Sequence, residues 1–173
     1  KRAPHAGQGE DSEMTIKTGD RVPSVTIQQL TKDGPQQVST DDFFKGKRVV
    51  VVGVPGAFTP VCSAKHLPSF VENAAAMLAK GVDVVACLSV NDAFVMAEWA
   101  KSQNTGDTVV MLADGNADFT KAAGFELDAS GFGLGLRSRR FAMLVEDGVI
   151  KNLQLEEGGA LDVSTAENML AAL

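Results

Sequence analysis

The fold is decided by the stretch VVVVGVPGAFTPVCS, residues 49–63. Its first part, Val49 to Val54, is apolar and β-branched, which predicts a strand buried on both faces within an open α/β sheet. Beyond it, apolar residues recur at helical spacing from Ser63 to Lys80, so this segment is predicted to be a helix. Cys62 is therefore expected where a central strand has ended and a helix begins.

The position of Cys62 favours a reactive thiolate. The first N–H groups of a helix have no partners within it, and together with the helix dipole they stabilise an anion. Pro55 and Pro60 stiffen the loop by fixing φ and withdrawing backbone donors, and Thr59 can place a hydroxyl beside the sulfur. The alternative is a buried structural thiol, the commonest state of a free cysteine. The helix start and the loop together favour the thiolate.

The rest of the chain alternates strands and helices around this unit. We predict a hairpin at 25–30 and 36–39, followed by the central strand at 48–54. Two further strands, at 82–90 and 108–112, each precede a helix, and the second of these helices is predicted at 116–123. A hairpin at 139–145 and 149–155 comes next, and a capping box at Ser164 opens the last helix. This order implies parallel pairing with right-handed crossovers. The predicted class is α/β: a thioredoxin-like fold with a mixed central sheet flanked by helices and an amino-terminal hairpin.

The length and the net charge of the chain limit its possible functions. With 173 residues the chain suits one domain, to which we assign residues 14–173. Residues 1–13 are polar and are expected to form a disordered leader, either a remnant of an expression vector or the end of a processed presequence. A net charge of -6 argues against nucleic acid and membrane surfaces as partners. Two cysteines without a visible secretory signal favour the cytoplasm, whereas a removed transit peptide would place the protein in an organelle.

Three motifs resemble the peroxiredoxins. The spacing Pro55-x-x-x-Thr59-x-x-Cys62 matches the active-site signature of that family, and the longer string PGAFTPVCS is similar to its type II, or atypical two-cysteine, branch. The likeness runs from about residue 14 to residue 173 and recurs at residues 86–92 and 133–140. Because the chain has no Cys-x-x-Cys, the dithiol chemistry common on thioredoxin-like folds is disfavoured.

The resemblance implies a thiol peroxidase that reduces hydrogen peroxide and organic hydroperoxides in antioxidant defence. Cys62 would be the peroxidatic cysteine, the Thr59 hydroxyl would bind the peroxide, Arg140 would be catalytic, and Pro55 completes the signature. The family works without metal, haem or flavin and forms homodimers. Two rival functions stay open: a redox sensor that signals through oxidised Cys62, and a noncatalytic thioredoxin-like interaction module.

Two adjacent arginines compete for the site. Period two along the predicted strand puts Arg140 on one face and Arg139 on the other, and the alternative for Arg140 is a solvated surface charge. The sequence pattern leaves this choice open, and the family match selects Arg140. His66 is expected to be a hydrogen-bonding or surface residue without a catalytic role, because two histidines and two cysteines are too few for structural zinc.

The segment from Leu127 to Leu136 breaks the alternation with three glycines and with apolar residues such as Phe132. It is either a surface loop or an apolar rim over the Cys62 pocket and a partner subunit. The rim is favoured, because a loop of this apolarity is costly if left in water.

The reductant depends on how Cys62 is regenerated. The mainly animal form of the family has a resolving cysteine near the carboxyl terminus, and residues 161–164 contain none. The plant-like form has its second cysteine at the position of Cys87, and residues 152–160 resemble that plant and bacterial form, which implies glutathione with glutaredoxin, or alternatively thioredoxin. A disulfide requires Cα atoms within about 7 Å, and Cys87 lies in an apolar predicted strand. Direct attack by glutathione or glutaredoxin on Cys62 is therefore favoured, with Cys87 mainly a core residue.

Overall fold

A computed structural model describes residues 15–157 and 160–173. The predicted leader, residues 1–13, lies outside the described residues. None of the helices in the described part of the chain combines the length and apolar character needed to cross a membrane.

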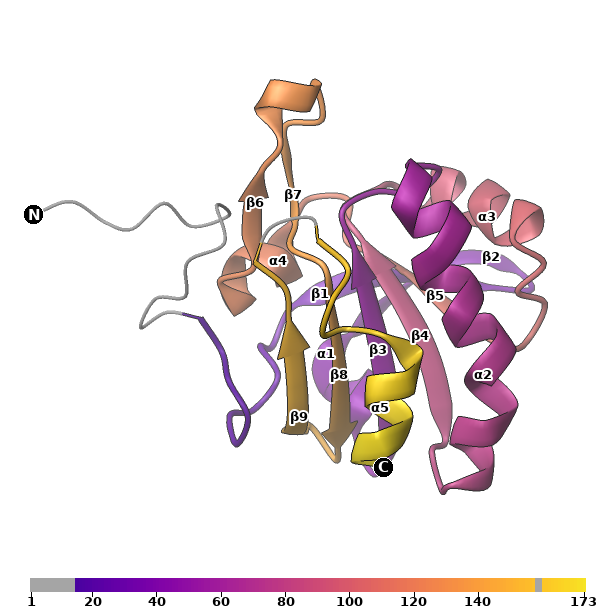
Figure 1. The fold of residues 1–173 in the computed structure, drawn as a ribbon. Helices are drawn as coiled ribbons and strands as arrows, with labels where there is room; N and C mark the ends of the chain where they lie inside the picture. Colours follow the sequence, from indigo (N-terminus) through magenta and orange to yellow (C-terminus); the bar gives the residue numbers. More distant parts are fainter. Residues whose placement is uncertain (1–14, 158–159) are drawn as a thin grey trace, which may run out of the picture.

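A seven-stranded mixed sheet forms the centre of the molecule (Figure 1). It consists of β1 (Thr26–Thr31), β2 (Gly34–Ser39), β3 (Arg48–Val54), β4 (Val84–Ser89), β5 (Val110–Ala113), β8 (Phe141–Glu146) and β9 (Val149–Leu155). Their spatial order is β2-β1-β5-β4-β3-β8-β9. The three central strands β3, β4 and β5 run parallel, and the strands beyond them on both sides pair antiparallel. The predicted mixed sheet and amino-terminal hairpin are confirmed.

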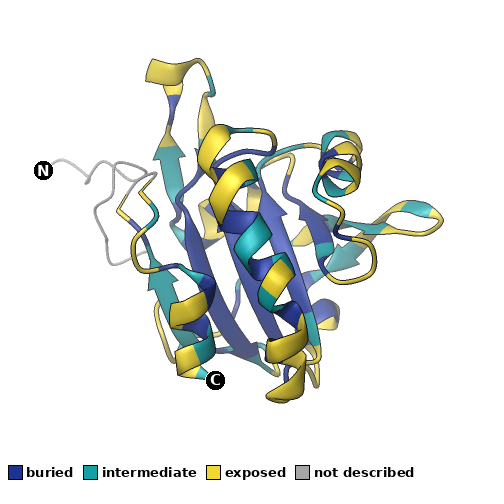
Figure 2. Cartoon of the chain, turned by 45° about the vertical axis from the view of Figure 1, so that its right-hand side comes forward, coloured by how far each residue is buried: buried dark blue, intermediate teal, exposed yellow. Residues whose placement is uncertain are grey.

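Helices cover both faces of this sheet. One face carries α2 (Leu67–Ala79), α3 (Ala93–Ser102) and α5 (Ala166–Ala172), and the other carries α1 (Thr40–Phe44) and α4 (Asp118–Ala123). The central strands lie buried between these layers, as the dark blue strands beneath the helices show (Figure 2). The chain therefore has two cores, one on each side of the sheet.

Strand β3 has the predicted bounds and is buried on both faces. Because alternate side chains point to opposite faces, Val52 packs into the core beneath α2, and Val51 packs into the core beneath α1 and α4. Gly53 interrupts the valines where the Phe141 ring of β8 crosses the strand, and a Cβ atom there would lie 2.2 Å from the ring. The strand that leads to Cys62 is thus held firmly on both sides.

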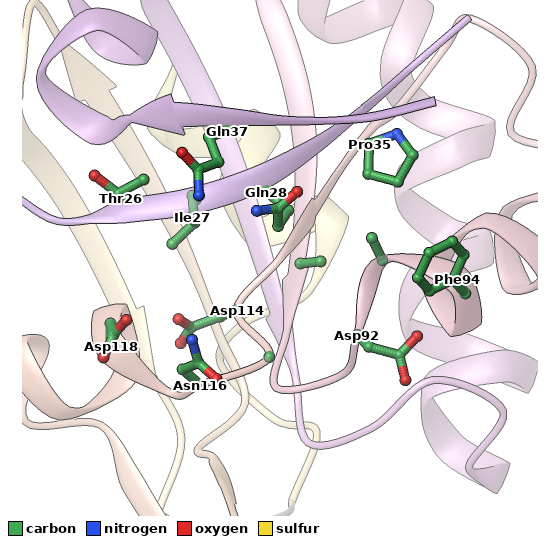
Figure 3. A pocket seen from close by; sticks show the side chains of 13 residues that line it. Thr26, Ile27, Gln28, Pro35, Gln37, Asp92, Phe94, Asp114, Asn116 and Asp118 are labelled. Carbon is green, nitrogen blue, oxygen red and sulfur yellow. The ribbon is translucent and has the colours of Figure 1, made fainter. Parts of the chain in front are cut away.

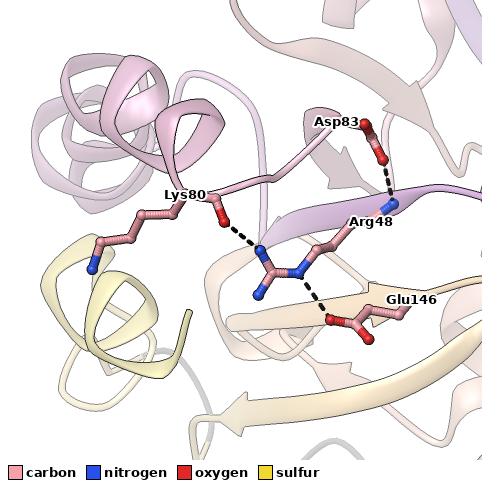
Figure 4. A network of polar contacts seen from close by, with 4 residues as sticks. All are labelled: Arg48, Lys80, Asp83 and Glu146. Carbon is pink, nitrogen blue, oxygen red and sulfur yellow. Dashed lines mark hydrogen bonds and ion pairs between the residues drawn. The ribbon is translucent and has the colours of Figure 1, made fainter.

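A polar network anchors the end of α2 that lies away from Cys62 (Figure 4). The guanidinium of Arg48 donates from Nε to Glu146 Oε2 at 2.8 Å and from Nη1 to the Lys80 carbonyl at 2.6 Å. The Arg48 backbone N–H donates to Asp83 Oδ2 at 2.8 Å, and Lys80 Nζ donates to the Leu170 carbonyl of α5 at 3.2 Å. These contacts fix the carboxyl end of α2 to β3, to β8 and to α5.

Three elements differ from the predicted pattern. The helix predicted from Ser63 opens with a π-turn, Cys62–His66, before α2 begins. The helix predicted at 116–123 begins only at Asp118, because Ala117 has a left-handed backbone with φ 60°. The segment at 127–136 is not a plain loop: β6 (Glu126–Asp128) and β7 (Leu136–Ser138) pair antiparallel, and a 3-10 turn, Ser130–Phe132, forms the tip that projects from the fold in Figure 1.

Candidate active site

Cys62 lies at the start of the helical segment that follows β3, as predicted. Its side chain is completely buried, with an exposed fraction of 0%. It is the first residue of the π-turn, whose wider i→i+5 bond runs from the Leu67 N–H to the Cys62 carbonyl. Single π-turns inside helices occur often at functional sites. The turn gives Cys62 a backbone setting that the 3.6-residue period alone does not reveal.

The loop before Cys62 is held by its own hydrogen bonds. Thr59 Oγ1 donates to the Gly56 carbonyl at 2.7 Å, and the Ser63 N–H donates to the Thr59 carbonyl at 2.9 Å. The Ala57 N–H donates to Asn91 Oδ1 at 2.9 Å, which ties the loop to the end of β4. Because the Thr59 hydroxyl donates its proton to the Gly56 carbonyl, its oxygen can still accept a hydrogen bond, for example from a hydroperoxide O–H.

Arg140 reaches Cys62 from the residue just before β8. Its Nη1 lies 3.3 Å from Cys62 Sγ and 3.1 Å from His66 Nδ1, and the residue is only 3% exposed. Arg139 points the other way, is also buried, and donates from Nε to the Glu156 carbonyl at 2.8 Å. The surface-charge alternative is therefore wrong for Arg140. A permanently charged guanidinium beside the sulfur can stabilise a thiolate and donate to an oxyanion.

His66 directs the Arg140 guanidinium. Its Nε2 lies 2.7 Å from the Ser164 carbonyl, which can only accept, so Nε2 carries the proton and Nδ1 accepts from Arg140. The pKa of His66 is lowered to about 4, mainly by burial; the bond to Ser164 opposes this shift, the charge of Arg140 adds to it, and the charge of Glu156 opposes it. The histidine is therefore neutral at physiological pH, and the prediction that it is a hydrogen-bonding residue is confirmed.

A buried carboxylate holds the loop that carries Ser164. Glu156 Oε2 accepts from the backbone N–H groups of Asp162, Val163 and Ser164 at 2.7, 2.7 and 2.8 Å and from the Ser164 hydroxyl at 2.8 Å. Burial raises the pKa of Glu156, but these bonds outweigh it and leave the pKa lowered. The predicted cap at Ser164 is wrong, since Thr165 caps α5. Sequence reasoning missed this support because Ser164 is 98 residues from His66.

An apolar cleft of about 280 Å³ opens above this group. Pro55, Thr59 and Arg140 line it together with Leu134 and Phe132 of the segment between β6 and β7. Phe132 is 86% exposed. The segment at 127–136 thus forms part of the rim of a cleft that reaches Thr59 and Arg140, the side chain that contacts Cys62. Its predicted contact with a partner subunit stays a prediction.

Cys87 lies inside β4, paired in register with Val52 of β3, and is completely buried. It packs in the same core cluster as Cys62, and both cysteines are free thiols. Burial raises the pKa of Cys87, and the nearby Cys62 raises it further. Cys87 is therefore protonated at neutral pH, which makes it a poor nucleophile.

A larger cavity, of about 470 Å³, lies elsewhere, between the β1–β2 hairpin and the ends of β4 and β5 (Figure 3). Two of its three carboxylates take part in hydrogen bonds within the fold: Asp92 accepts from the Val95 N–H at 2.8 Å, and Asp114 accepts from the Thr120 N–H and hydroxyl at 2.9 and 2.8 Å. The third, Asp118, is exposed. Within the described residues no group of three or more metal-binding side chains gathers. The reactive groups therefore converge at Cys62 and not here.

Comparison with known proteins agrees with this arrangement. The Redoxin family profile matches residues 17–170. Peroxiredoxin-2E-2, chloroplastic, of Oryza sativa subsp. japonica is 51% identical over 164 residues, which cover 92% of this chain and 73% of that protein. The chain belongs to the peroxiredoxin family. Peroxiredoxin-2B of Arabidopsis thaliana is 45% identical over 159 residues, with 91% of this peroxiredoxin and 98% of that protein covered.

A solved structure supports the same assignment. Reduced Prx3 of Vibrio vulnificus in complex with H2O2 is 49% identical, has a TM-score of 0.87, and covers 91% of this peroxiredoxin and 99% of its own chain. The thioredoxin-like fold and the type II branch, to which the peroxiredoxin-2 relatives belong, are thus confirmed. This peroxiredoxin is a thiol peroxidase.

The neutral His66 makes a testable contribution to the stability of this peroxiredoxin. Its pKa is 6.5 when unfolded and about 4 when folded, so the unfolded chain binds more protons between these values and stability falls as the pH drops. From pH 7 to pH 4.5 we expect His66 to cost about 2 kcal/mol in the free energy of unfolding. Urea unfolding of wild type and His66→Asn at both pH values measures it. Equal losses in the two proteins would contradict a buried neutral imidazole.

Proposed function

We propose that Cys62 is the peroxidatic cysteine and that Thr59, Arg140 and Pro55 form its active site. The observation that carries the proposal is the 3.3 Å contact between Arg140 Nη1 and Cys62 Sγ beneath a cleft that is open to small molecules. In the reaction the Cys62 thiolate attacks one peroxide oxygen and the O–O bond breaks. An S–O bond forms, so Cys62 becomes a sulfenic acid, and the second oxygen leaves as hydroxide or alkoxide and takes up a proton to give water or an alcohol.

The groups around Cys62 lower the activation barrier by stabilising the negative charge that moves from the sulfur to the departing oxygen. Arg140 donates hydrogen bonds first to the thiolate and then to the departing oxygen, so it stabilises the negative charge as that charge moves from sulfur to oxygen. Thr59, whose own proton is bound by Gly56, accepts from the peroxide O–H and orients it toward the sulfur. Pro55 fixes the loop between β3 and Cys62. His66 keeps the guanidinium in place without adding charge.

The cleft supports hydrogen peroxide and small organic hydroperoxides as substrates. Its volume of about 280 Å³ is several times the roughly 30 Å³ that a water molecule occupies, and most of its lining is apolar, so an alkyl or aryl group fits beside the peroxide. Steady turnover of cumene hydroperoxide with a thiol donor supports an enzyme. A single oxidation of Cys62 without turnover would instead favour the redox sensor, and no reaction would favour an interaction module.

We propose glutathione with glutaredoxin as the reductant, and thioredoxin as the alternative. Cys87 is protonated inside β4, so an external thiol is the better nucleophile toward the sulfenic acid. Treatment with one equivalent of peroxide, with and without glutathione, followed by mass spectrometry, should give a Cys62–glutathione disulfide. A quantitative Cys62–Cys87 disulfide without glutathione, together with loss of turnover in folded Cys87→Ser, would make Cys87 the resolving residue.

We further propose a homodimer that packs near the active site. Support comes from exposed aromatic side chains beside the cleft and on the adjoining helix: Phe58 is 53% exposed, Phe94 75% and Phe132 86%. An apolar surface of this kind is costly in water and marks an interaction site. Sedimentation equilibrium should give about twice the 18.2 kDa chain mass. A monomer at high micromolar concentration would contradict the dimer.

The cellular compartment is also a proposal. We propose the cytoplasm, with an organelle as the alternative: peroxiredoxin-2E-2 of rice and peroxiredoxin-2E of Arabidopsis thaliana are named chloroplastic, whereas the names of peroxiredoxin-2B and peroxiredoxin-2D of Arabidopsis thaliana give no compartment.

A further inference from the structure

The cleft that Arg140 lines is bounded by a loop with little packing of its own. Residues 129–135, here called the rim loop, connect β6 to β7, and Ala129, Phe132 and Leu134 of this loop line the cleft. Apart from Ala129 and Leu134 its residues are exposed, and three of its seven residues are glycine. Glycine adds backbone freedom, so a loop of this composition keeps one position only where other groups hold it.

Arg137 ties the rim loop to the central sheet. Its Nε donates to the Leu134 carbonyl at 2.9 Å, and its Nη1 donates to the Val90 carbonyl at 3.2 Å. Leu134 belongs to the rim loop, whereas Val90 follows directly on β4. Because the planar guanidinium presents its N–H groups in fixed directions, one side chain can join two carbonyls from distant segments. Arg137 therefore fixes Leu134 relative to the sheet.

The loop that precedes the π-turn is attached at the same place. The Ala57 N–H donates to Asn91 Oδ1 at 2.9 Å, and Asn91 is the neighbour of Val90. A Cβ atom at Gly56 would lie 3.1 Å from Arg137 Nη1, so the missing side chain of Gly56 leaves room for the guanidinium. Two adjacent residues beyond β4 thus hold the two loops that line the cleft, one of them through Arg137.

Arg137 lies apart from the reacting atoms. Arg140 lines the cleft and lies 3.3 Å from Cys62 Sγ, whereas Arg137 is not among the described residues that line the cleft. The hydrogen bonds of Arg137 end on backbone carbonyls. Its guanidinium is therefore placed to hold the shape of the cleft and not to act on a peroxide.

The position of the rim loop matters most for substrates that carry an apolar group. Hydrogen peroxide has no such group, so its reaction depends on Cys62, Thr59 and Arg140. The alkyl or aryl group of an organic hydroperoxide needs apolar surface, and Phe132 and Leu134 provide it. A shift of the rim loop away from the cleft therefore removes contacts from the organic substrate alone.

We propose that Arg137 is a positioning residue that sets how well organic hydroperoxides compete with hydrogen peroxide for Cys62. It does so by holding the rim loop, and Leu134 in particular, at a fixed distance from the loop at residues 55–61. The inference rests on the proposed function of Cys62 and of the cleft. The step at the sulfur is the same for both substrates, so Arg137 acts on the binding of the organic group and not on cleavage of the O–O bond.

Replacing Arg137 by methionine tests this role, because it removes the donors and keeps an unbranched side chain. In an assay with a thiol donor, kcat/KM for each peroxide reports the oxidation of Cys62. We expect the ratio of kcat/KM for cumene hydroperoxide to kcat/KM for hydrogen peroxide to fall about tenfold, the lower end of the effect of one methylene group in an apolar pocket. Partial unfolding would lower both values together and leave the ratio unchanged, so the ratio isolates the positioning role.

Two further variants make the comparison specific. Arg21→Met is the matched control, because Arg21 is exposed and lies beside Gly148, at a pocket that does not include the rim loop. Its substrate ratio should equal that of wild type. Arg137→Lys keeps the charge but has no planar fork to join two carbonyls, so it should restore only part of the ratio. Full restoration by lysine would overturn the two-carbonyl contact as the cause.

Replacing Leu134 by alanine tests whether Arg137 acts through the rim loop. This variant removes the apolar side chain and keeps the carbonyl that Arg137 binds. Because both residues are proposed to act on one contact, the ratio in the double variant should fall by less than the product of the two single effects. Independent effects, which multiply in the double variant, would contradict action through Leu134.

Hydrogen exchange tests the same contact without turnover. The N–H groups of Phe132, Gly133 and Leu134 donate to backbone carbonyls of the rim loop. We expect them to exchange about tenfold faster in Arg137→Met than in Arg21→Met, as the loss of hydrogen bonds from a charged donor would cause. The amides of β4 serve as the reference for global stability.

These outcomes separate the inference from the proposed function. A wild type that reduces neither peroxide would overturn the peroxidase proposal, and hydrogen exchange would still test the tie made by Arg137. In an active wild type, a substrate ratio in Arg137→Met within twofold of that in Arg21→Met would overturn the inference. Exchange of the rim loop within twofold of the control would overturn its cause, the hold of Arg137 on Leu134.

Discussion

Replacing Cys62 by serine is expected to reduce peroxide turnover to the uncatalysed background, a loss of at least about 10⁴-fold. A serine hydroxyl at neutral pH is not ionised and is a far weaker nucleophile toward O–O bonds, while its size nearly matches that of the thiol. Consumption of hydrogen peroxide with a thiol donor measures the effect, and circular dichroism checks the fold. Cys87→Ala is the matched control, because it removes the other buried thiol.

The Cys87→Ala variant separates loss of the nucleophile from loss of a buried thiol. Both cysteines are completely buried and share one core cluster, so loss of a thiol from this core is common to the two variants. We expect Cys87→Ala to keep turnover with glutathione within a few-fold of wild type, since Cys87 is proposed to be a core residue. Substantial turnover in Cys62→Ser would contradict the proposed nucleophile.

Replacing Arg140 by methionine should slow the reaction with peroxide by about 10²–10³-fold, the usual cost of removing a donor that faces developing charge. The guanidinium lies 3.3 Å from Cys62 Sγ, and methionine fills much of its volume without any donor. Rapid-mixing measurement of the oxidation step isolates this effect from reduction by the thiol.

Arg139→Met is the comparison that makes the result specific. Arg139 is equally buried but bonds the Glu156 carbonyl on the other side of the strand. We expect that variant to lose thermal stability while each folded molecule reacts with peroxide at close to the wild-type rate. Equal slowing in the two variants would show that the site needs both charges and not the Arg140 contact.

Periodicity predicted much of the fold because burial leaves a simple pattern. The uninterrupted valines of β3 match a strand covered on both faces, and alternation along residues 139–145 separated Arg140 from Arg139 before any contact was known. Periodicity does not say which face of a strand meets which helix. That choice came from the family resemblance, and the contact of Arg140 with Cys62 agrees with it.

The features that sequence reasoning missed depend on contacts between distant segments. His66 bonds the Ser164 carbonyl across 98 residues, and Arg140 lies 74 residues from His66, so no local window contains the group. The spacing around Ser164 fits a capping box. In the structure, however, the Ser164 hydroxyl and N–H both donate to Glu156, and Thr165 caps α5 instead. Tertiary hydrogen bonds outweighed the local preference here.

The β6–β7 hairpin and the π-turn were missed for a different reason. Strands of three residues are too short for alternation to stand out, and the glycines around Phe132 resemble an ordinary loop. A π-turn adds one residue to a helical turn without a characteristic residue type. Cys62 begins the π-turn, and the hairpin lines the cleft that Arg140 also lines, which fits the expectation that local rules fail most often at functional sites.

The most direct test of the proposed chemistry is stopped-flow mixing of reduced protein with less than one equivalent of hydrogen peroxide. Trp99 is the sole tryptophan and bonds Ser63, next to Cys62, so its fluorescence reports oxidation of the thiol. We expect a change within milliseconds to seconds at micromolar concentrations, consumption of one peroxide per Cys62, and absence of the signal in Cys62→Ser. Oxidation no faster than that of free cysteine under the same conditions would contradict an activated peroxidatic Cys62.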